Sequence, residues 1–193
     1  MCLECEEGVR CVIKNINLEA CMKILKVPYI KQINSNSCGA AVLEMVYKYY
    51  GIENVSQEEL MDRYKELEPH GSGNYRMATD TLVADAKEKG FKSECLRANY
   101  KSAKDCFSLL RENIEIKKIP VIVCQKFTDE EPLIGHFRVV IGMDENSIYL
   151  HDPHLETGGE RLKWSLDKFI NFWQPTGDNV TGGIFCLISK KDE

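Results

Sequence analysis

Hydrophobic and polar residues follow a helical period in the first part of the chain and an extended pattern in the last part. The clearest helical stretch begins after the polar segment 34–37, and Gly51 follows it as a left-handed C-cap. Its apolar residues recur at the spacing of one buried helix face, at Val42, Met45, Val46, Tyr49 and Tyr50. Similar spacing predicts three further helices, over about 57–67, 77–89 and 102–116.

Short β-branched and apolar runs dominate the second half of the chain. They predict strands at 120–125, 135–142, 147–152 and 183–188, with a further short strand over 91–96. A turn over 143–147 pairs the second and third of these runs as a hairpin. A loop over 153–159 and a short helix over 164–173 precede the final strand. Because helices come first and strands later, we expect an α+β fold with a mostly antiparallel sheet.

Length and composition narrow the class of protein. The 193 residues, 44% hydrophobic and 28% charged, fit one globular domain or one domain with a short appendage. A net charge of −5 argues against a nucleic-acid partner, because phosphate binding needs concentrated Lys and Arg. No apolar run reaches membrane-spanning length, and the acidic N-terminus does not resemble a secretory signal. With nine cysteines and no such signal, we expect a reducing, cytoplasmic location.

The first 25 residues differ from the rest of the chain in their cysteine content. They contain Cys2, Cys5, Cys11 and Cys21. The first two have a spacing that can bind zinc, but the later gaps do not fit a zinc ribbon and no histidine lies nearby. We therefore predict a cysteine-rich extension over 1–25, without a metal or cofactor, followed by one domain over 26–193. A metal-binding or docking role for this extension remains an alternative.

Cys38 lies where the polar loop becomes the first long helix. Unpaired backbone N–H groups and the helix dipole favour a thiolate at this position, and a thiolate is the nucleophilic form of cysteine. Gln32, on the entering loop, can supply an amide donor to an oxyanion formed by attack on a carbonyl. A small buried structural cysteine is the alternative interpretation.

His136 and Asp152 lie at the adjacent ends of the predicted hairpin. An aspartate beside a histidine fixes the imidazole tautomer and stabilises the imidazolium, as a Cys–His–Asp triad requires. Strand alternation then turns His151 to the opposite face. Structural roles for both residues, or a metal site at His151, Asp152 and His154, are the alternatives; we do not expect the metal, because no third ligand shares one face.

Several motifs occur in a fixed order over residues 26–188. They are Val27-Pro28-Tyr29-Ile30, Gln32, Cys38-Gly39, Tyr49-Tyr50-Gly51, Gly90-Phe91, Gly135-His136-Phe137-Arg138-Val139-Val140-Ile141-Gly142 and Tyr149-Leu150-His151-Asp152-Pro153. This set resembles the C39 peptidase and C39-like family. The resemblance implies a papain-like fold, in which an N-terminal helical half packs against the sheet.

By position, the resemblance implies that Cys38 is the nucleophile, His136 the general base, Asp152 the orienting residue and Gln32 the oxyanion donor. Family members often carry Asp before the cysteine and Pro after Cys-Gly, where this chain has Ser37 and Ala40. Known members are attached to transporters and cut leader peptides, often after Gly-Gly; these two departures put that specificity in doubt.

We therefore predict a cysteine peptidase that hydrolyses amide bonds of a peptide or protein substrate. Two alternatives remain open. The same residues can serve an amidase or a transpeptidase-type acyl transferase, or the chain can be a catalytically silent module that binds a peptide or partner. The sequence leaves the oligomeric state and the substrate undetermined.

Overall fold

The computed structural model describes residues 24–64, 76–97, 103–128, 135–174 and 183–191. Within these residues the chain forms one six-stranded sheet with strand order β1-β6-β2-β3-β4-β5, and every neighbouring pair is antiparallel. The strands are β1 (Lys92–Arg97), β2 (Val121–Lys126), β3 (Gly135–Met143), β4 (Ser147–Asp152), β5 (Gly159–Ser165) and β6 (Ile184–Ser189).

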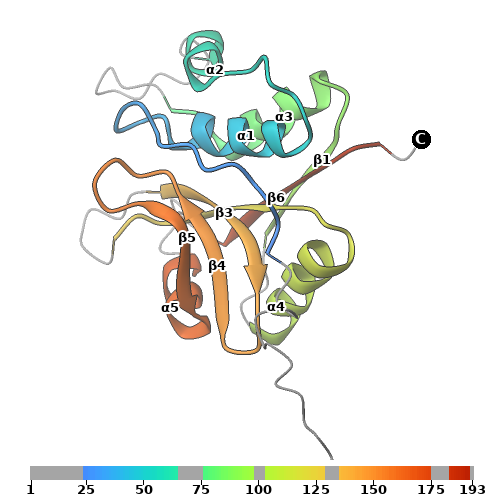
Figure 1. Cartoon of the computed structure of the whole chain (residues 1–193), viewed down its shortest axis with the longest axis vertical. Helices are drawn as coiled ribbons and strands as arrows, with labels where there is room; N and C mark the ends of the chain where they lie inside the picture. Colours follow the sequence, from blue (N-terminus) through green and yellow to red (C-terminus); the bar gives the residue numbers. More distant parts are fainter. Residues whose placement is uncertain (1–23, 65–75, 98–102, 129–134, 175–182, 192–193) are drawn as a thin grey trace, which may run out of the picture.

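The helices lie in two groups around this sheet. They are α1 (Cys38–Tyr49), α2 (Gln57–Tyr64), α3 (Thr79–Glu88), α4 (Ala103–Arg111), the π-helix η2 (Glu112–Ile116) and α5 (Leu166–Trp173). Figure 1 shows α1, α2 and α3 together at one end of the sheet, with α4 and α5 away from them. The predicted α+β organisation, a helical half against an antiparallel sheet, is confirmed.

Helix α1 is buried on more sides than its amphipathic pattern predicts. Ala41, Leu43 and Tyr47 lie off the predicted face, yet none of them is exposed. The reason is that α1 contacts β3 on one side and both α2 and α3 on the other. Gly39 shows how tight this contact is, because a Cβ there would lie 3.1 Å from the Met77 Cβ. Close packing therefore fixes the N-terminal end of α1 against the sheet.

The structure corrects two predicted elements. The segment 159–165 forms edge strand β5 instead of a loop and the start of a helix, and α5 begins at Leu166 with Ser165 accepting a hydrogen bond from the Lys168 N–H. The sequence hides β5 because its residues are mostly polar and exposed, while its pairing with β4 supplies the backbone hydrogen bonds. The predicted helix over 102–116 becomes α4 followed by η2.

Other sequence expectations fall partly outside the described residues. The cysteine-rich segment with Cys2, Cys5, Cys11 and Cys21 lies there, so its role stays a prediction. The described chain begins at Ile24, and the Leu25 N–H donates to the Ile141 carbonyl of β3 over 2.8 Å. Among the helices of the described ranges, none combines the length and apolar character that crossing a membrane demands.

Candidate active site

Cys38 is the first residue of α1, and the loop before it is held in place by Ser37. The Ser37 hydroxyl accepts hydrogen bonds from the N–H groups of Ile33 and Asn34 and donates to the Asn34 carbonyl. Ser37 is fully buried, so its hydroxyl finds its hydrogen-bond partners within the protein. The residue in place of the family's frequent aspartate therefore organises the turn that delivers Cys38.

His136 and Asp152 meet at the end of the β3–β4 hairpin, as the sequence predicts. His136 Nε2 lies 2.7 Å from Asp152 Oδ1, and the two residues are 4% and 2% exposed. His151, the neighbour of Asp152, points elsewhere: its Nε2 donates to the Val27 carbonyl and its Nδ1 accepts from the Arg161 N–H. Asp152 and His151 thus use opposite faces of β4.

Cys38 and His136 line the same cavity of about 240 Å³. Its other lining residues are Ser35, Asn36, Arg76, Phe127, Gly135 and His154. The His136 ring lies close enough to the Cys38 thiol to lower the pKa of that thiol. Because Nε2 of His136 bonds to Asp152, Nδ1 is the ring nitrogen that remains for the thiol. A thiol, an imidazole and a carboxylate therefore lie in one series.

The environment of the pair favours the charged forms of both side chains. Burial raises the pKa of the Cys38 thiol, but the hydrogen bond and charge of His136, with the backbone N–H groups of Phe137 and Gly39, lower it below its ordinary value. Burial lowers the pKa of His136, but its hydrogen bonds with Asp152 and Cys38 raise it above its ordinary value. A thiolate beside an imidazolium is the arrangement that these two shifts promote.

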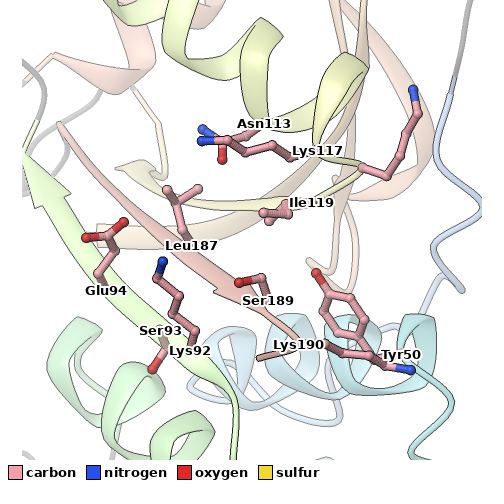
Figure 2. Close-up of a pocket in the computed structure, with 11 residues that line it drawn as sticks. Tyr50, Lys92, Ser93, Glu94, Asn113, Lys117, Ile119, Leu187, Ser189 and Lys190 are labelled. Atoms are coloured by element: carbon pink, nitrogen blue, oxygen red, sulfur yellow. The ribbon is translucent and has the colours of Figure 1, made fainter. Parts of the chain in front are cut away.

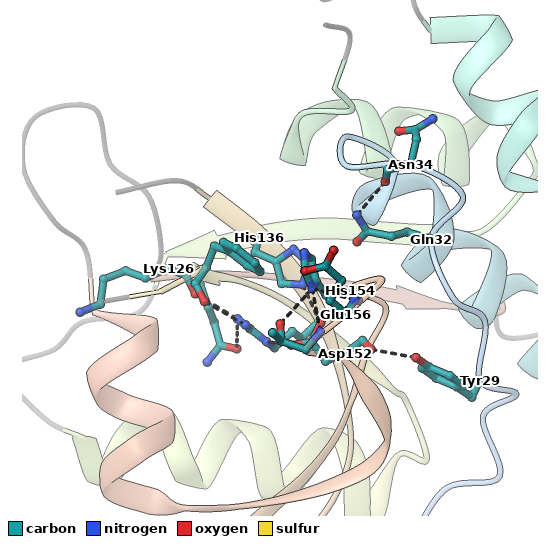
Figure 3. A network of polar contacts seen from close by, with 12 residues as sticks. Tyr29, Gln32, Asn34, Lys126, His136, Asp152, His154 and Glu156 are labelled. Carbon is teal, nitrogen blue, oxygen red and sulfur yellow. Dashed lines mark hydrogen bonds and ion pairs between the residues drawn. The ribbon is translucent and has the colours of Figure 1, made fainter. Parts of the chain in front are cut away.

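Asp152 remains an anion because several donors surround it. Burial alone raises its pKa, but the His136 hydrogen bond, the Arg138 charge and the His154 N–H together bring that pKa well below the ordinary value. Arg138 Nε donates to Oδ2 over 2.6 Å, and the His154 N–H donates to Oδ1 over 3.0 Å. Figure 3 shows this network between the ends of β2, β3 and β4.

Gln32 lies close to this network through its backbone, while its side chain is turned toward its own loop. Its N–H donates to the Pro153 carbonyl over 2.9 Å, and its Nε2 donates to the Asn34 carbonyl over 2.7 Å (Figure 3). The amide is 2% exposed and its Oε1 has no hydrogen-bond partner among the described residues. Gln32 does not line the cavity, although the second hydrogen of Nε2 is not engaged by the Asn34 bond.

Sequence reasoning missed two residues that hold the site together. Gln57, on α2, accepts from the Ile33 N–H and donates to the Lys31 carbonyl, so it fixes the loop before Cys38. Arg138, on β3, binds Asp152. A lone arginine inside an apolar strand was the available signal for Arg138, because buried charges need a partner; no local pattern identified Gln57.

A metal centre at His151, Asp152 and His154 does not fit the structure, since the His151 nitrogens bond to backbone groups. Across the described ranges no three His, Cys, Asp or Glu side chains come together as a metal site.

A larger cavity of about 500 Å³ opens between β1, β6 and the segment around η2 (Figure 2). It is lined by Lys92, Lys117, Lys118 and Lys190 but by no cysteine or histidine, so it does not offer a thiol with an imidazole base.

Comparisons with known proteins find both relatives in sequence and solved structures of similar fold. The chain is 26% identical over 158 residues to the Lactococcin transport/processing ATP-binding protein LcnC-like of Lactococcus lactis subsp. lactis (strain IL1403). The match covers 79% of this chain and 18% of that relative, so the chain spans less than a fifth of the relative's length.

Two solved structures share the fold. One, described as a C39-like peptidase from Bacillus anthracis, has a TM-score of 0.66 at 21% identity, covering 89% of this chain and 99% of that one. The peptidase domain of Streptococcus ComA, a bifunctional ABC transporter of a quorum-sensing pathway, has a TM-score of 0.60 at 21% identity, covering 86% and 99%. These likenesses confirm the expected papain-like peptidase fold. The model of the Peptidase_C39 like family matches residues 24–181, and the chain belongs to this family.

Proposed function

We propose that the protein is a cysteine peptidase that hydrolyses amide bonds of a peptide or protein substrate. Cys38 is the nucleophile, His136 the general base and acid, Asp152 the residue that orients His136, and Gln32 an oxyanion donor. The observation that carries this proposal is the 2.7 Å contact between His136 Nε2 and Asp152 Oδ1, with the His136 ring lining the same cavity as Cys38. A structural cysteine needs neither partner.

In the first half of the reaction the Cys38 thiolate attacks the scissile carbonyl carbon. The carbonyl oxygen becomes an oxyanion, which the Cys38 N–H at the start of α1 stabilises, joined by Gln32 when its Nε2 turns from the Asn34 carbonyl toward the cavity. The C–N bond then breaks, the His136 imidazolium protonates the departing amine, and a thioester remains on Cys38.

In the second half His136, now neutral, removes a proton from an incoming water. The hydroxide attacks the thioester carbonyl, the C–S bond breaks, and the acid leaves while the Cys38 thiolate and the His136 imidazolium are restored. Asp152 keeps Nε2 of His136 occupied throughout, which leaves Nδ1 for the proton transfers. If an amine attacks the thioester in place of water, the same residues catalyse acyl transfer, which is the alternative function.

The relative from Lactococcus lactis has a name that combines transport and processing. Processing is the part of that name that a Cys–His pair can carry out, so we infer a peptide as the substrate class. Ser37 and Ala40 stand where leader-cutting members often have Asp and Pro, and we therefore assign no Gly-Gly specificity. We also propose 26–193 as the peptidase domain, with 1–25 as an extension to it, acting in a reducing compartment such as the cytoplasm.

Profiling against a peptide library tests the proposal. The full chain should cleave a subset of peptides, and Cys38→Ala should cleave none while keeping the melting temperature. Adding an amine competitor separates the two enzyme classes: free acids alone indicate a hydrolase, and amide products indicate a transferase. Cleavage that persists in Cys38→Ala, or no cleavage of any peptide by the full chain, would overturn the peptidase assignment.

A further inference from the structure

Arg138 is a buried cation in the middle of an apolar strand. It lies two residues after His136 on β3, so both side chains lie on the same face of the sheet. It is only 2% exposed. Arginine is almost never fully buried without partners, because its charge loses solvation that only fixed partners replace. The partners of the Arg138 guanidinium therefore indicate the role of its buried charge.

The guanidinium contacts Asp152 on one side and the end of β2 on the other. Nε donates to Asp152 Oδ2 over 2.6 Å. One terminal nitrogen donates to the Lys126 carbonyl over 3.0 Å, and the other approaches the Phe127 carbonyl at 3.4 Å. The first of these nitrogens also approaches Gln125 Oε1 at 3.4 Å, and a planar fork held at these four points fixes the direction from which Asp152 is approached.

Two aromatic rings hold the same guanidinium from the far side of the site. Its central carbon lies 4.9 Å from the Trp164 ring centre and 5.8 Å from that of Phe172, which come from β5 and α5. Cation–π contacts of this kind are strongest where water is excluded. The part of the sheet that sequence analysis did not predict thus supports the orientation of Asp152.

We propose that Arg138 is a positioning residue for the reaction, which holds Asp152 in the orientation that presents Oδ1 to His136 and offsets the effect of the Asp152 charge on the imidazole. The catalytic role of Arg138 rests on the proposed function. The effect of Arg138 on His136 through Asp152 can be measured without any substrate.

The two carboxylate oxygens of Asp152 bind different donors, and this explains how Arg138 positions the carboxylate. Oδ1 accepts from His136 and from the His154 N–H, whereas Oδ2 accepts from Arg138. Without Arg138, Oδ2 loses its charged donor, and the carboxylate can rotate away from the imidazole. Because the barrier to proton transfer depends on the ring geometry, such rotation lowers kcat more than it changes KM.

The charge of Arg138 acts in the opposite direction to that of Asp152. Burial lowers the pKa of His136, the hydrogen bonds to Asp152 and Cys38 raise it, and the Arg138 charge lowers it. Removing the cation therefore raises the pKa of His136 further as long as Asp152 keeps its bond to Nε2, and the imidazolium then persists to higher pH. The other ionisable groups around Arg138 are Cys38, Cys124, His154, Lys126 and Lys168, and the Arg138 charge also lowers the pKa of His154.

Two substitutions separate the charge from the geometry. Arg138→Gln removes the charge, and Arg138→Lys keeps a charge but lacks the planar fork. A pH titration of the histidine ring NMR signals on the full chain measures this effect, and the His136 signal is identified by its loss in His136→Ala. The titration midpoint of His136 should be about one pH unit higher in Arg138→Gln than in the wild type. In Arg138→Lys the midpoint should stay near the wild-type value, while kcat on a cleaved peptide falls about tenfold at similar KM.

Arg63→Gln is the matched control, because Arg63 pairs with Asp85 and Glu88 and does not line the cavity. It should leave the His136 midpoint and kcat unchanged. An unchanged His136 midpoint in folded Arg138→Gln would overturn the electrostatic part, and wild-type kcat in Arg138→Lys would overturn the positioning part. If Arg138→Gln does not fold, Arg138→Lys alone decides. If no peptide is cleaved, the NMR titration still tests the action on His136, so the two proposals fail separately.

Discussion

The Gln32 N–H donates a hydrogen bond to the Pro153 carbonyl over 2.9 Å. Gln32 precedes the helix that begins at Cys38, and Pro153 directly follows Asp152, so this bond joins the two halves of the candidate site through their backbones. The Tyr29 hydroxyl adds a second link, donating to the Asp152 carbonyl over 3.2 Å. The position of the proposed oxyanion donor is thereby coupled to the position of the residue that orients His136.

Gln32→Ala should lower kcat by about a hundredfold or more with little change in KM, because it removes a donor that acts on the oxyanion and not on the bound carbonyl. The backbone bond to Pro153 does not depend on the side chain, so the loop should keep its position. Steady-state kinetics on a cleaved peptide measure this effect. The alkylation rate of Cys38 by iodoacetamide should stay at the wild-type value, since the thiol environment is unchanged.

Gln57→Ala serves as the comparison for this variant. Gln57 fixes the same loop through the Ile33 N–H and the Lys31 carbonyl but lies on α2, away from the carbonyl under attack. It should lower the melting temperature and alter both kcat and Cys38 alkylation. If Gln32→Ala behaves like Gln57→Ala, the Gln32 amide serves the loop and is not an oxyanion donor.

Iodoacetamide should label Cys38 faster than the other cysteines at pH 6 to 7. The pKa of Cys38 is lowered by His136 against the effect of burial, so its thiolate persists below the ordinary thiol pKa and is lost only as the pH falls through the lowered value. Mass spectrometry after brief alkylation measures the rate for each cysteine. His136→Ala should abolish the preference, because it removes the hydrogen bond and the charge.

The same protein in guanidinium chloride is the control for this labelling, since unfolding gives all nine thiols similar environments. If the cysteines rank in the same order of alkylation rate in the native and the denatured protein, Cys38 is not activated by the fold. A preference that survives in His136→Ala would assign the activation to the helix terminus instead of the imidazole.

The residues found from sequence are those whose partners follow from local spacing. Cys38 was identified from a loop that turns into an amphipathic helix, and His136 with Asp152 from two strands joined by a short turn. Both inferences need only the spacing of apolar residues along the chain and the length of the turn between the two strands. The meeting of these two parts came from the family resemblance, because no local pattern relates α1 to the β3–β4 hairpin.

What remained hidden depends on contacts that have no local pattern. Arg138 had to have a partner, but only the folded register shows that the partner is Asp152. The direction of the Gln32 amide is set by the Asn34 carbonyl, and Gln57 reaches the loop from a different helix. Strand β5 forms from mostly polar residues because β4 offers it a paired edge.

Asp85→Ala should lower the free energy of unfolding by about 3 kcal/mol or more, because it leaves two buried tyrosine hydroxyls without their acceptor and removes one of the two carboxylate partners of Arg63. Asp85 on α3 is fully buried and accepts from the hydroxyls of Tyr47 and Tyr64 and from Arg63. Since Tyr47 belongs to α1, this carboxylate ties the Cys38 helix to α3. Urea unfolding measures the loss. Tyr64→Phe removes one bond only and should cost about 1 kcal/mol; equal losses for the two variants would contradict a shared acceptor.

Asp152→Asn should lower kcat by about a hundredfold or more, since the amide keeps the shape of the carboxylate but does not stabilise the imidazolium or fix the ring tautomer.

The pKa of Asp152 lies below its ordinary value of about 3.9 in the folded protein. The ionised group therefore stabilises the fold at neutral pH, and this contribution declines as the pH falls below the ordinary value. Urea midpoints at pH 7 and about pH 3 should consequently differ less in Asp152→Asn than in the wild type. Glu156→Gln, an exposed carboxylate on the following loop, should keep the wild-type difference. A wild-type pH dependence in Asp152→Asn would show that the buried contacts of Asp152 with His136 and Arg138 do not stabilise its ionised form.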